Sequence, residues 1–180
     1  HFNDEELRRL AEAGTGVAHC PISNMKLSSG VCRVPELLAL GAPVGLAVDG
    51  SASNDGSSLL EELRVGYLLH RLHASERAPS GYDMLKLASS GGARLLGRTD
   101  IGALEPGKAG DLFLLRKNRL ELVGADLDPK SLLGAVGFRG AVDYTVAAGR
   151  VVVRDGRLTG IDEEAEARRA GALVRAYLAR

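Results

Sequence analysis

Asp49 has the position in this sequence where a carboxylate is most often used for chemistry. It follows the short apolar run 44–48, which is typical of a buried parallel strand, and a glycine and small polar residues come after it. In parallel α/β folds, active sites are assembled at this end of the strands. We therefore treat Asp49 as a candidate site residue. The alternative is an aspartate that only caps the next helix or binds loop amides.

His19 stands in the equivalent place at the end of the preceding apolar run, 16–20. A histidine there, one strand–helix unit away from Asp49, can serve as a metal ligand, a general acid or base, or a donor to substrate. The alternative is a buried histidine bonded to a backbone carbonyl. Cys20 adds no nucleophile to this pair, because successive residues of a strand point to opposite faces and cannot form a dyad.

Other polar patterns indicate ordinary structural roles. The Gly- and Ser-rich segment 50–56 lacks the lysine and the spacing of a phosphate-binding loop. No G-x-S-x-G elbow occurs, which disfavours a serine hydrolase. We expect His70 and His73 to lie on the surface near the end of a helix, where the helix dipole favours histidine. We expect a solvated helix face to carry Glu61, Glu62 and Arg64.

The first half of the chain predicts alternating helices and strands. The expected helices are 3–13, 35–40, 58–72 and two short ones within 82–97; the expected strands are 16–20 and 44–48. This alternation at short spacing is the signature of βαβ units and a parallel sheet. Two parallel strands cannot complete such a sheet, so we expect further strands to come from elsewhere.

The second half has a different pattern. Strands are expected at 111–115, 142–147 and 151–154, the last two as a hairpin, and a polar, Ala-rich helix at 162–178. Glycine and proline cluster at 97–110, where we place a boundary. The prediction is an α/β portion over residues 1–100 and a small β domain with a terminal helix over 101–180.

Composition excludes several classes of protein. The 180 residues are 45% hydrophobic and 26% charged, which is ordinary for a folded chain and unlike a disordered or fibrous one. Lys plus Arg and Asp plus Glu both number 23, so there is no basic excess to bind nucleic acid. No apolar run is long enough to span a membrane. Two cysteines suggest a reducing compartment, and we expect a soluble, cytoplasmic protein.

Four segments resemble the amidohydrolase superfamily, in the family's order. Residues 19–30 resemble its H-x-P-x-S-N-x-x-L-x-x-G segment, and 44–54 resemble its penultimate barrel signature, G-x-D-G-x-x-S-N. Residues 102–112 are similar to its G-x-L-x-x-G-x-x-A-D-L return into the small β domain, and 144–150 to its V-x-x-G-x-x-V hairpin. Each match alone is weak, whereas four in order over nearly the whole chain are a strong signal.

The resemblance implies the C-terminal portion of a TIM (β/α)₈ barrel, its last two strands and helices, followed by part of a small β-sandwich built from both chain ends. It implies that Asp49 is the metal-binding aspartate at the end of the eighth strand. In such sites this residue takes a proton from metal-bound water and passes it to the leaving amine. His19 would line the substrate pocket, and Asn24 would shape the loop beneath the substrate. The expected cofactor is one divalent metal, zinc, with iron as the alternative.

The run 48–55 is most similar to the 8-oxoguanine deaminase group. This similarity implies a hydrolytic deaminase that removes an exocyclic amine from a purine-like heteroaromatic base, with 8-oxoguanine as the first choice. Isoxanthopterin, guanine, triazine and adenosine-type substrates remain alternatives. The expected partner is this small-molecule heteroaromatic substrate, and we expect neither nucleic acid nor a membrane as a partner.

The family's other metal ligands do not occur in this sequence. They are the H-x-H pair of the first strand, the His and Glu of the fifth strand and the His of the sixth, and all precede the matched region. The sequence opens at His1 without a methionine and reads like the middle of a chain; His1 does not replace a missing ligand. We therefore expect a partial active site and a homo-oligomer or association with a missing N-terminal part. The alternative is a non-catalytic truncated remnant.

Overall fold

The computed structural model describes residues 2–179, with the side chain of residue 126 left out, so His1 lies outside it. The chain forms two compact units. The first contains the residues up to Lys108 together with Lys117–Arg139, and the second contains Ala109–Arg116 and the residues from Gly140 onward. Each unit is described separately below. The predicted division of the chain at residue 100 into two family domains stays a prediction.

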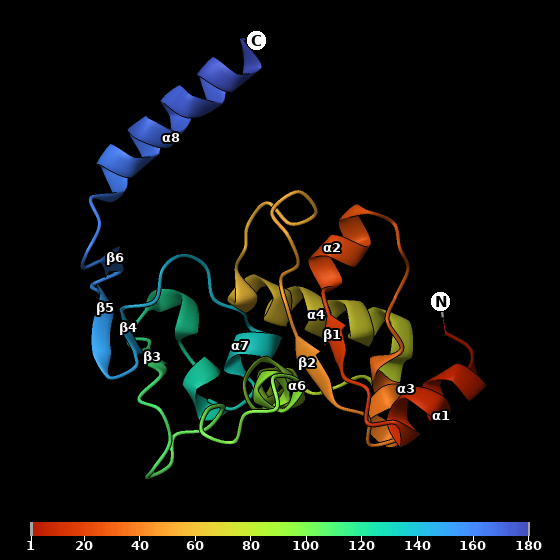
Figure 1. Ribbon diagram of the computed structural model, residues 1–180. Coiled ribbons are helices and arrows are strands. Elements are labelled where there is room, and N and C mark those ends of the chain that lie inside the picture. The colour runs from red at the N-terminus through yellow and green to blue at the C-terminus, as the bar shows by residue number, and fades with distance from the viewer. Residues whose placement is uncertain (1, 180) are drawn as a thin grey trace. The chain divides into compact units, whose positions relative to one another are not determined.

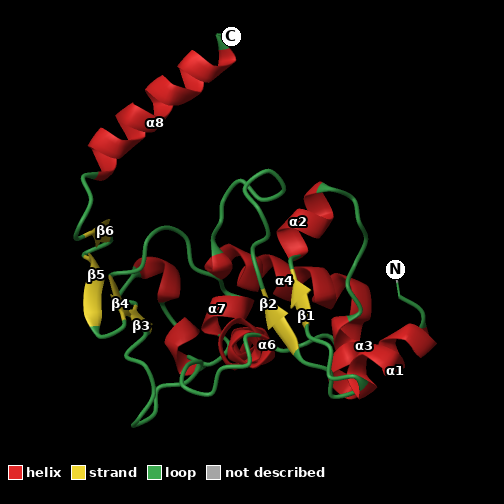
Figure 2. Cartoon of the chain, viewed as in Figure 1, coloured by secondary structure: helices red, strands yellow, loops and turns green. Residues whose placement is uncertain are grey.

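The first unit is built on two parallel strands, β1 (Val17–His19) and β2 (Val44–Leu46), which pair with His19 opposite Leu46. Helices α2 (Pro21–Lys26) and α3 (Val34–Ala39) connect them. Both strands point toward the end of the pair where α2 and the loop after β2 lie (Figures 1 and 2). The predicted helix–strand alternation is therefore present, although each strand is only three residues long.

The other helices and helical turns of the first unit's first 108 residues pack against this strand pair or against one another. They are α1 (Asp4–Glu12), α4 (Leu59–Ala74), the 3₁₀ turn η1 (Ser75–Arg77), α5 (Gly81–Lys86), the π-helical turn η2 (Leu87–Gly91) and α6 (Gly92–Leu95). The last three follow one another without a break, so the two short helices expected within 82–97 are one continuous helical run. The buried apolar side chains include Val34, Leu37, Val44, Leu46, Leu63, Met84 and Leu87.

Glycine allows α6 to approach the strands closely. A Cβ atom on Gly45 of β2 would lie 2.6 Å from Cδ1 of Leu95, and one on Gly16, just before β1, would lie 2.5 Å from Cδ2 of the same leucine. These separations are too short for real carbon contacts. Leu95 therefore occupies space that only glycine leaves free on this face of the strand pair.

The segment 117–139 also belongs to the first unit. It contains η3 (Leu120–Leu122), η4 (Ala125–Leu127) and α7 (Leu132–Ala135). Leu122, Leu133 and Phe138 are buried, and α7 packs against α4 and α5. The sequence pattern predicts no helix or strand here, because the apolar residues of one-turn helices are too few to show a helical period.

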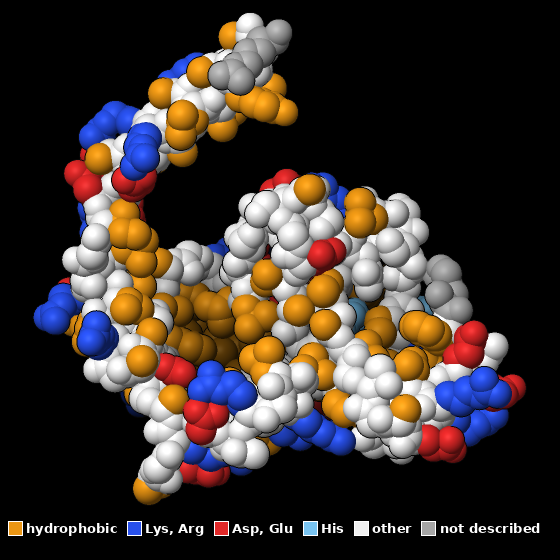
Figure 3. Space-filling model, in the orientation of Figure 1, with side chains coloured by type: hydrophobic (Ala, Val, Ile, Leu, Met, Phe, Trp, Pro, Cys, Tyr) orange, Lys and Arg blue, Asp and Glu red, His pale blue; other side chains and the backbone are white. Residues whose placement is uncertain are grey.

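The second unit contains an antiparallel sheet in the order β3 (Leu112–Leu114), β4 (Tyr144–Ala147), β5 (Arg150–Arg154) and β6 (Arg157–Leu158). The three predicted strands are present, whereas β6 was not expected. Helix α8 (Glu163–Leu178) follows. No described residue in these five elements is fully buried. Apolar side chains lie exposed along α8, as Figure 3 shows: Leu173, Val174, Tyr177 and Leu178.

The helices of the described residues were compared with the length and hydropathy of membrane-spanning helices. None of them combines the length and the apolar character needed to cross a bilayer.

Candidate active site

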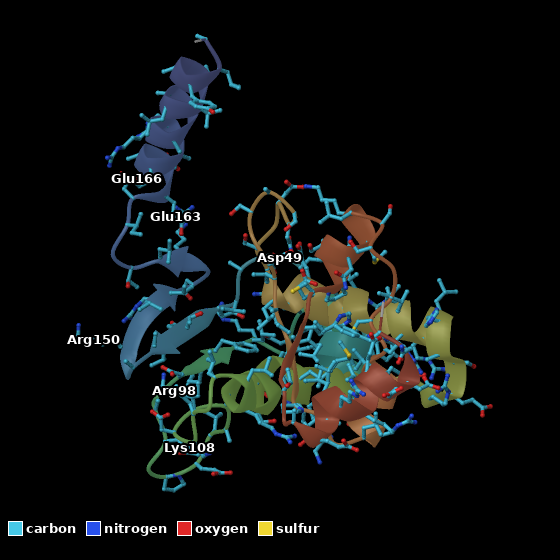
Figure 4. All side chains as sticks on the ribbon, turned by 45° about the vertical axis from the view of Figure 1, so that its right-hand side comes forward. Asp49, Arg98, Lys108, Arg150, Glu163 and Glu166 are labelled. Carbon is cyan, nitrogen blue, oxygen red and sulfur yellow. The ribbon has the colours of Figure 1, made fainter. Side chains whose placement is uncertain are left out.

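Asp49 lies three residues after β2, at the base of the loop that leads to α4, beside α2 (Figure 4). Its side chain is exposed, and its backbone adopts the left-handed region with φ of 66°. Among residues with a side chain, aspartate and asparagine tolerate this conformation best. The turn is thus compatible with an acid of this length, and it presents the carboxylate at the carboxyl end of the strand pair, as the sequence predicts.

Three donors orient this carboxylate. The Ser23 hydroxyl donates to Oδ2 at 2.6 Å, the Ser53 hydroxyl donates to the same oxygen at 2.9 Å, and the Gly50 amide donates to Oδ1 at 2.7 Å. These bonds, that from Ser23 first, hold the pKa of Asp49 below its usual range. Because a carboxylate offers about four acceptor positions, an ionised Asp49 retains capacity for a metal or a proton.

Glu62 is fully buried, although the sequence analysis places it on a solvated face. This expectation is wrong. Its Oε2 accepts from the Ile22 amide at 3.0 Å, and its Oε1 accepts from the side-chain amide of Asn54. Burial raises the pKa of this carboxyl group. Asn54, itself 1% exposed, also donates to the Val48 carbonyl at 2.8 Å, which fixes the loop around Asp49.

Arg64 also departs from the expected solvated face. Its guanidinium is half-buried and donates to the Gly134 carbonyl at 3.1 Å and to the Ala135 carbonyl. These carbonyls lie at the end of α7 and have no partner within that short helix. Arg64 therefore joins α4 to α7, while Glu61 is exposed as expected.

His19 and His70 form a buried pair. The two rings are 1% and 0% exposed, and the sequence-based expectation that His70 lies on the surface is wrong, whereas His73 is exposed as expected. Their Nε2 atoms lie 3.0 Å apart. His19 thus points into the interior toward α4, and its predicted contact with substrate stays a prediction.

Asn24 is half-buried in α2 and borders an open hollow of about 610 Å³. Apolar residues of α1, β1 and α3 line much of it, including Leu7, Val17 and Leu37. Asp49 is not among the described residues that line this hollow. Asn24 therefore borders a hollow that Asp49 does not line, and the role of Asn24 beneath a substrate stays a prediction.

The two cysteines do not form a nucleophilic site. Both thiols are free. Burial raises the pKa of Cys32 to about 11 and also raises that of Cys20, so both remain protonated at neutral pH. Because the thiolate is the reactive form, this environment argues against a cysteine hydrolase.

The described residues do not form a complete zinc site. They contain no group of three or more His, Cys, Asp or Glu side chains arranged to hold a metal ion. A catalytic zinc takes three protein ligands and a water. Asp49 offers an oxygen suited to a metal, and the side chains that donate to its carboxylate are those of Ser23 and Ser53. The described residues therefore do not contain a complete zinc site.

Fold and site together define an α/β protein that presents an ionised carboxylate at the carboxyl end of a parallel strand pair. Residues 1–152 match the amidohydrolase family, and the chain belongs to this family. The resemblance found in the sequence motifs is thereby confirmed.

Two curated relatives are similar over most of the chain. Hydroxydechloroatrazine ethylaminohydrolase of Pseudomonas sp. (strain ADP) is 48% identical over 97% of this chain, and 8-oxoguanine deaminase of Pseudomonas aeruginosa is 47% identical over 90% of it. The chain spans only 37% and 36% of these relatives, in their C-terminal parts.

Solved structures agree with this assignment. The atrazine chlorohydrolase from Arthrobacter aurescens TC1 complexed with zinc has a TM-score of 0.90 and 33% identity, covering 97% of this chain and 39% of that one. An adenosine deaminase from Xanthomonas campestris with bound zinc has a TM-score of 0.85 and 30% identity, covering 98% and 41%. The chain thus has the α/β fold of the matching part of these structures.

Proposed function

We propose that this chain is the C-terminal part of a metal-dependent hydrolytic deaminase that removes an exocyclic amine from a purine-like heteroaromatic base, with 8-oxoguanine as the first substrate. One observation carries the proposal: an exposed, ionised Asp49 is held by Ser23, Gly50 and Ser53 at the carboxyl end of parallel strands. The 47% identity to an 8-oxoguanine deaminase supports the choice of substrate.

In the proposed enzyme, β1 and β2 are the last two strands of a (β/α)₈ barrel. The parallel pairing of β1 and β2 and the helices that follow each strand support this arrangement. Residues encoded before His1 supply the remaining strands and metal ligands. The β3–β6 sheet belongs to a small β-sandwich completed by the same upstream segment.

Asp49 has two tasks in this reaction. It would hold the metal, and it would accept the proton of the attacking water and then deliver it to the leaving amine. A divalent metal, zinc in our proposal, would make hydroxide available at neutral pH when bound. The hydroxyls of Ser23 and Ser53 keep Asp49 ionised and fix its direction, so the carboxylate is ready to accept a proton at neutral pH. The zinc-bound relatives support the choice of metal.

The direct test uses the complete protein, with the residues encoded upstream of His1, loaded with zinc. We expect ammonia release from 8-oxoguanine that exceeds release from guanine and isoxanthopterin and disappears when a chelator removes the metal. No turnover of any of these bases would contradict the proposal. The remnant alternative predicts that the complete protein holds no zinc and releases no ammonia, so one tightly held zinc per chain in that protein would argue against a remnant.

A triazine aminohydrolase is the second candidate. The relative with 48% identity is named for removing an ethylamino group from hydroxydechloroatrazine, which is also hydrolysis at an exocyclic C–N bond. The same assay discriminates the two candidates. Ethylamine release from this triazine, faster than ammonia release from 8-oxoguanine, would favour the second.

We also propose that the isolated chain is oligomeric or poorly soluble, or that it associates with the upstream part. The exposed apolar side chains of the second unit support this, since Phe113 and Leu114 of β3 are 42% and 55% exposed. A clean monomer in size-exclusion chromatography, with cooperative unfolding, would contradict it.

A further inference from the structure

We infer that Glu62 is the positioning residue for Asp49: its buried carboxylate holds the two backbone segments whose serine hydroxyls orient the Asp49 carboxylate. This inference rests on the proposed function for its kinetic consequence. Its structural part concerns only contacts within the first unit.

Glu62 and Asp49 form hydrogen bonds with residues that are adjacent in the sequence. Glu62 accepts from the Ile22 amide, and the next residue, Ser23, donates to Asp49. Glu62 also accepts from Asn54, and the preceding residue, Ser53, donates to the same oxygen of Asp49. Glu62 and Asp49 thus form hydrogen bonds with the same two segments, at adjacent residues. A shift of either segment away from Glu62 would move a hydroxyl away from Asp49.

The burial of Glu62 between α2 and α4 restricts the movement of its side chain. Glu62 lies in the first turn of α4, whose N-terminus is capped by Ser58, and its side chain is 0% exposed. Leu63 and Gly66 of the same helix are also buried. A Cβ atom on Gly66 would lie 3.3 Å from Cγ of Pro21, the first residue of α2, so α2 and α4 are in close contact. Water therefore cannot replace the carboxylate oxygens without a rearrangement.

A carboxyl group satisfies both contacts, whereas an amide would not. Ile22 and Asn54 each present a donor, so both oxygens of residue 62 must accept. The amide of Asn54 cannot turn over to offer an acceptor instead. Its Oδ1 accepts from the Gly56 and Ser57 amides at 3.2 and 3.3 Å, and its Nδ2 donates to the Val48 carbonyl. Glutamine at position 62 would place an NH₂ group against one of the two donors.

The main experiment compares Glu62→Gln with Glu61→Gln in the complete zinc-loaded protein. Glu61 is the exposed neighbour in the same helical turn and provides a matched control. We expect Glu62→Gln to lower kcat about tenfold, because a misdirected general base loses much of its contribution, while KM changes less than about twofold. Glu61→Gln should retain the wild-type kcat. A folded Glu62→Gln enzyme with wild-type kcat would overturn the inference.

A double-mutant cycle separates positioning from a general loss of stability. If Glu62 acts through the two hydroxyls, Glu62→Gln should lower kcat little further in a protein that already carries Ser23→Ala and Ser53→Ala. The effects of substitutions at residues that act through one another are not additive. Additive losses would overturn the inference. If Glu62→Gln does not fold, Glu62→Asp takes its place in the same test. It keeps the charge but is one methylene too short to reach both donors, so it should show the same kcat loss and the same lack of additivity.

Hydrogen exchange at the Gly50 amide, which donates to Asp49, gives a readout that does not need turnover. We expect about tenfold faster exchange at Gly50 in Glu62→Gln and no change in Glu61→Gln. Unchanged exchange would overturn the positioning role even in an active enzyme. Conversely, faster exchange in a protein that deaminates nothing would refute the proposed function and leave the positioning role intact.

Discussion

His19 of β1 and His70 of α4 face each other in the interior of the first unit, with their Nε2 atoms 3.0 Å apart and both Nδ1 atoms buried without a hydrogen-bond partner. One ring must donate to the other, so the accepting imidazole is neutral. Burial lowers the pKa of His19 to about 3 and that of His70 to about 4. Because protonation of this pair is unfavourable in the folded state, the free energy of unfolding should depend on pH.

We predict that this unit loses stability as the pH falls from 6.5 toward 4. Unfolded histidines titrate near pH 6.5, so below that pH the unfolded chain binds protons that the folded chain excludes. The free energy of unfolding in urea should fall by about 4 kcal/mol between pH 7.5 and 5, about 2 kcal/mol for each buried histidine. His70→Gln, which keeps a partner for His19 but does not titrate, should reduce this loss by about half. His73→Gln is the exposed control and should leave the loss unchanged; equal losses in all three proteins would refute the explanation.

Asp49→Asn should abolish deamination in the complete enzyme. Asparagine tolerates the left-handed backbone of residue 49 but cannot accept a proton. We expect kcat to fall at least about a hundredfold, as for the loss of a general base, with an unchanged circular dichroism spectrum. Asp55→Asn, in the same loop, removes an exposed acid that pairs with Lys26 and should retain activity. Retained turnover in Asp49→Asn would remove Asp49 from the mechanism.

Gly134→Ala should destabilise the packing of α5 on α7. The added methyl group would lie 2.7 Å from the Gly81 Cα atom, which belongs to the backbone and cannot turn aside. We expect a loss of about 1–3 kcal/mol in the free energy of unfolding. Gly92→Ala is the matched control: its backbone is helical and the methyl group would meet nothing within 4 Å. It should gain about 0.4–1 kcal/mol. A Gly134→Ala protein as stable as Gly92→Ala would show that these helices separate easily.

Arg64→Met should weaken the contact between α4 and α7. The substitution keeps much of the apolar stem but removes the donors to the Gly134 and Ala135 carbonyls, which would remain half-buried without a partner. We expect a loss of about 1–2 kcal/mol in the free energy of unfolding. Arg71→Met, at an exposed position of the same helix, should change it by less than about 0.5 kcal/mol. Equal effects of the two substitutions would contradict the role of Arg64.

The sequence was sufficient to predict the strand pair and the place of Asp49. A short apolar run followed by an acid and glycine is a local signal, and the structure puts Asp49 at the carboxyl end of β2 as expected. The motif that contains Ser23 was recognised as a family segment. Its hydrogen bond to Asp49 was not predicted, because the two residues are 26 positions apart and only the parallel register brings them together.

Glu62 and His70 show where the sequence reasoning failed. Glu62 was expected on a solvated helix face beside Glu61 and Arg64, and His70 on the surface because the helix dipole favours histidine near a C-terminus. A weak signal existed, since residues 62, 66 and 70 recur every four positions and share one face of α4 with Leu63. The partners that make their burial tolerable lie 40 and 51 positions away, at Ile22 and His19. No local pattern could have identified these partners.

The π-helical turn η2 sits inside the continuous helical run from Gly81 to Leu95. Such a turn has the geometry of one additional residue inserted into an α-helix. The wider turn absorbs this residue locally, so deleting one residue from η2 should restore a regular helix and leave Leu95 beside Gly16 and Gly45. A deletion in the regular turn of α5 would instead rotate everything beyond it by about 100° around the helix axis. The helical run should therefore tolerate the loss of one residue in η2 better than the loss of one in α5.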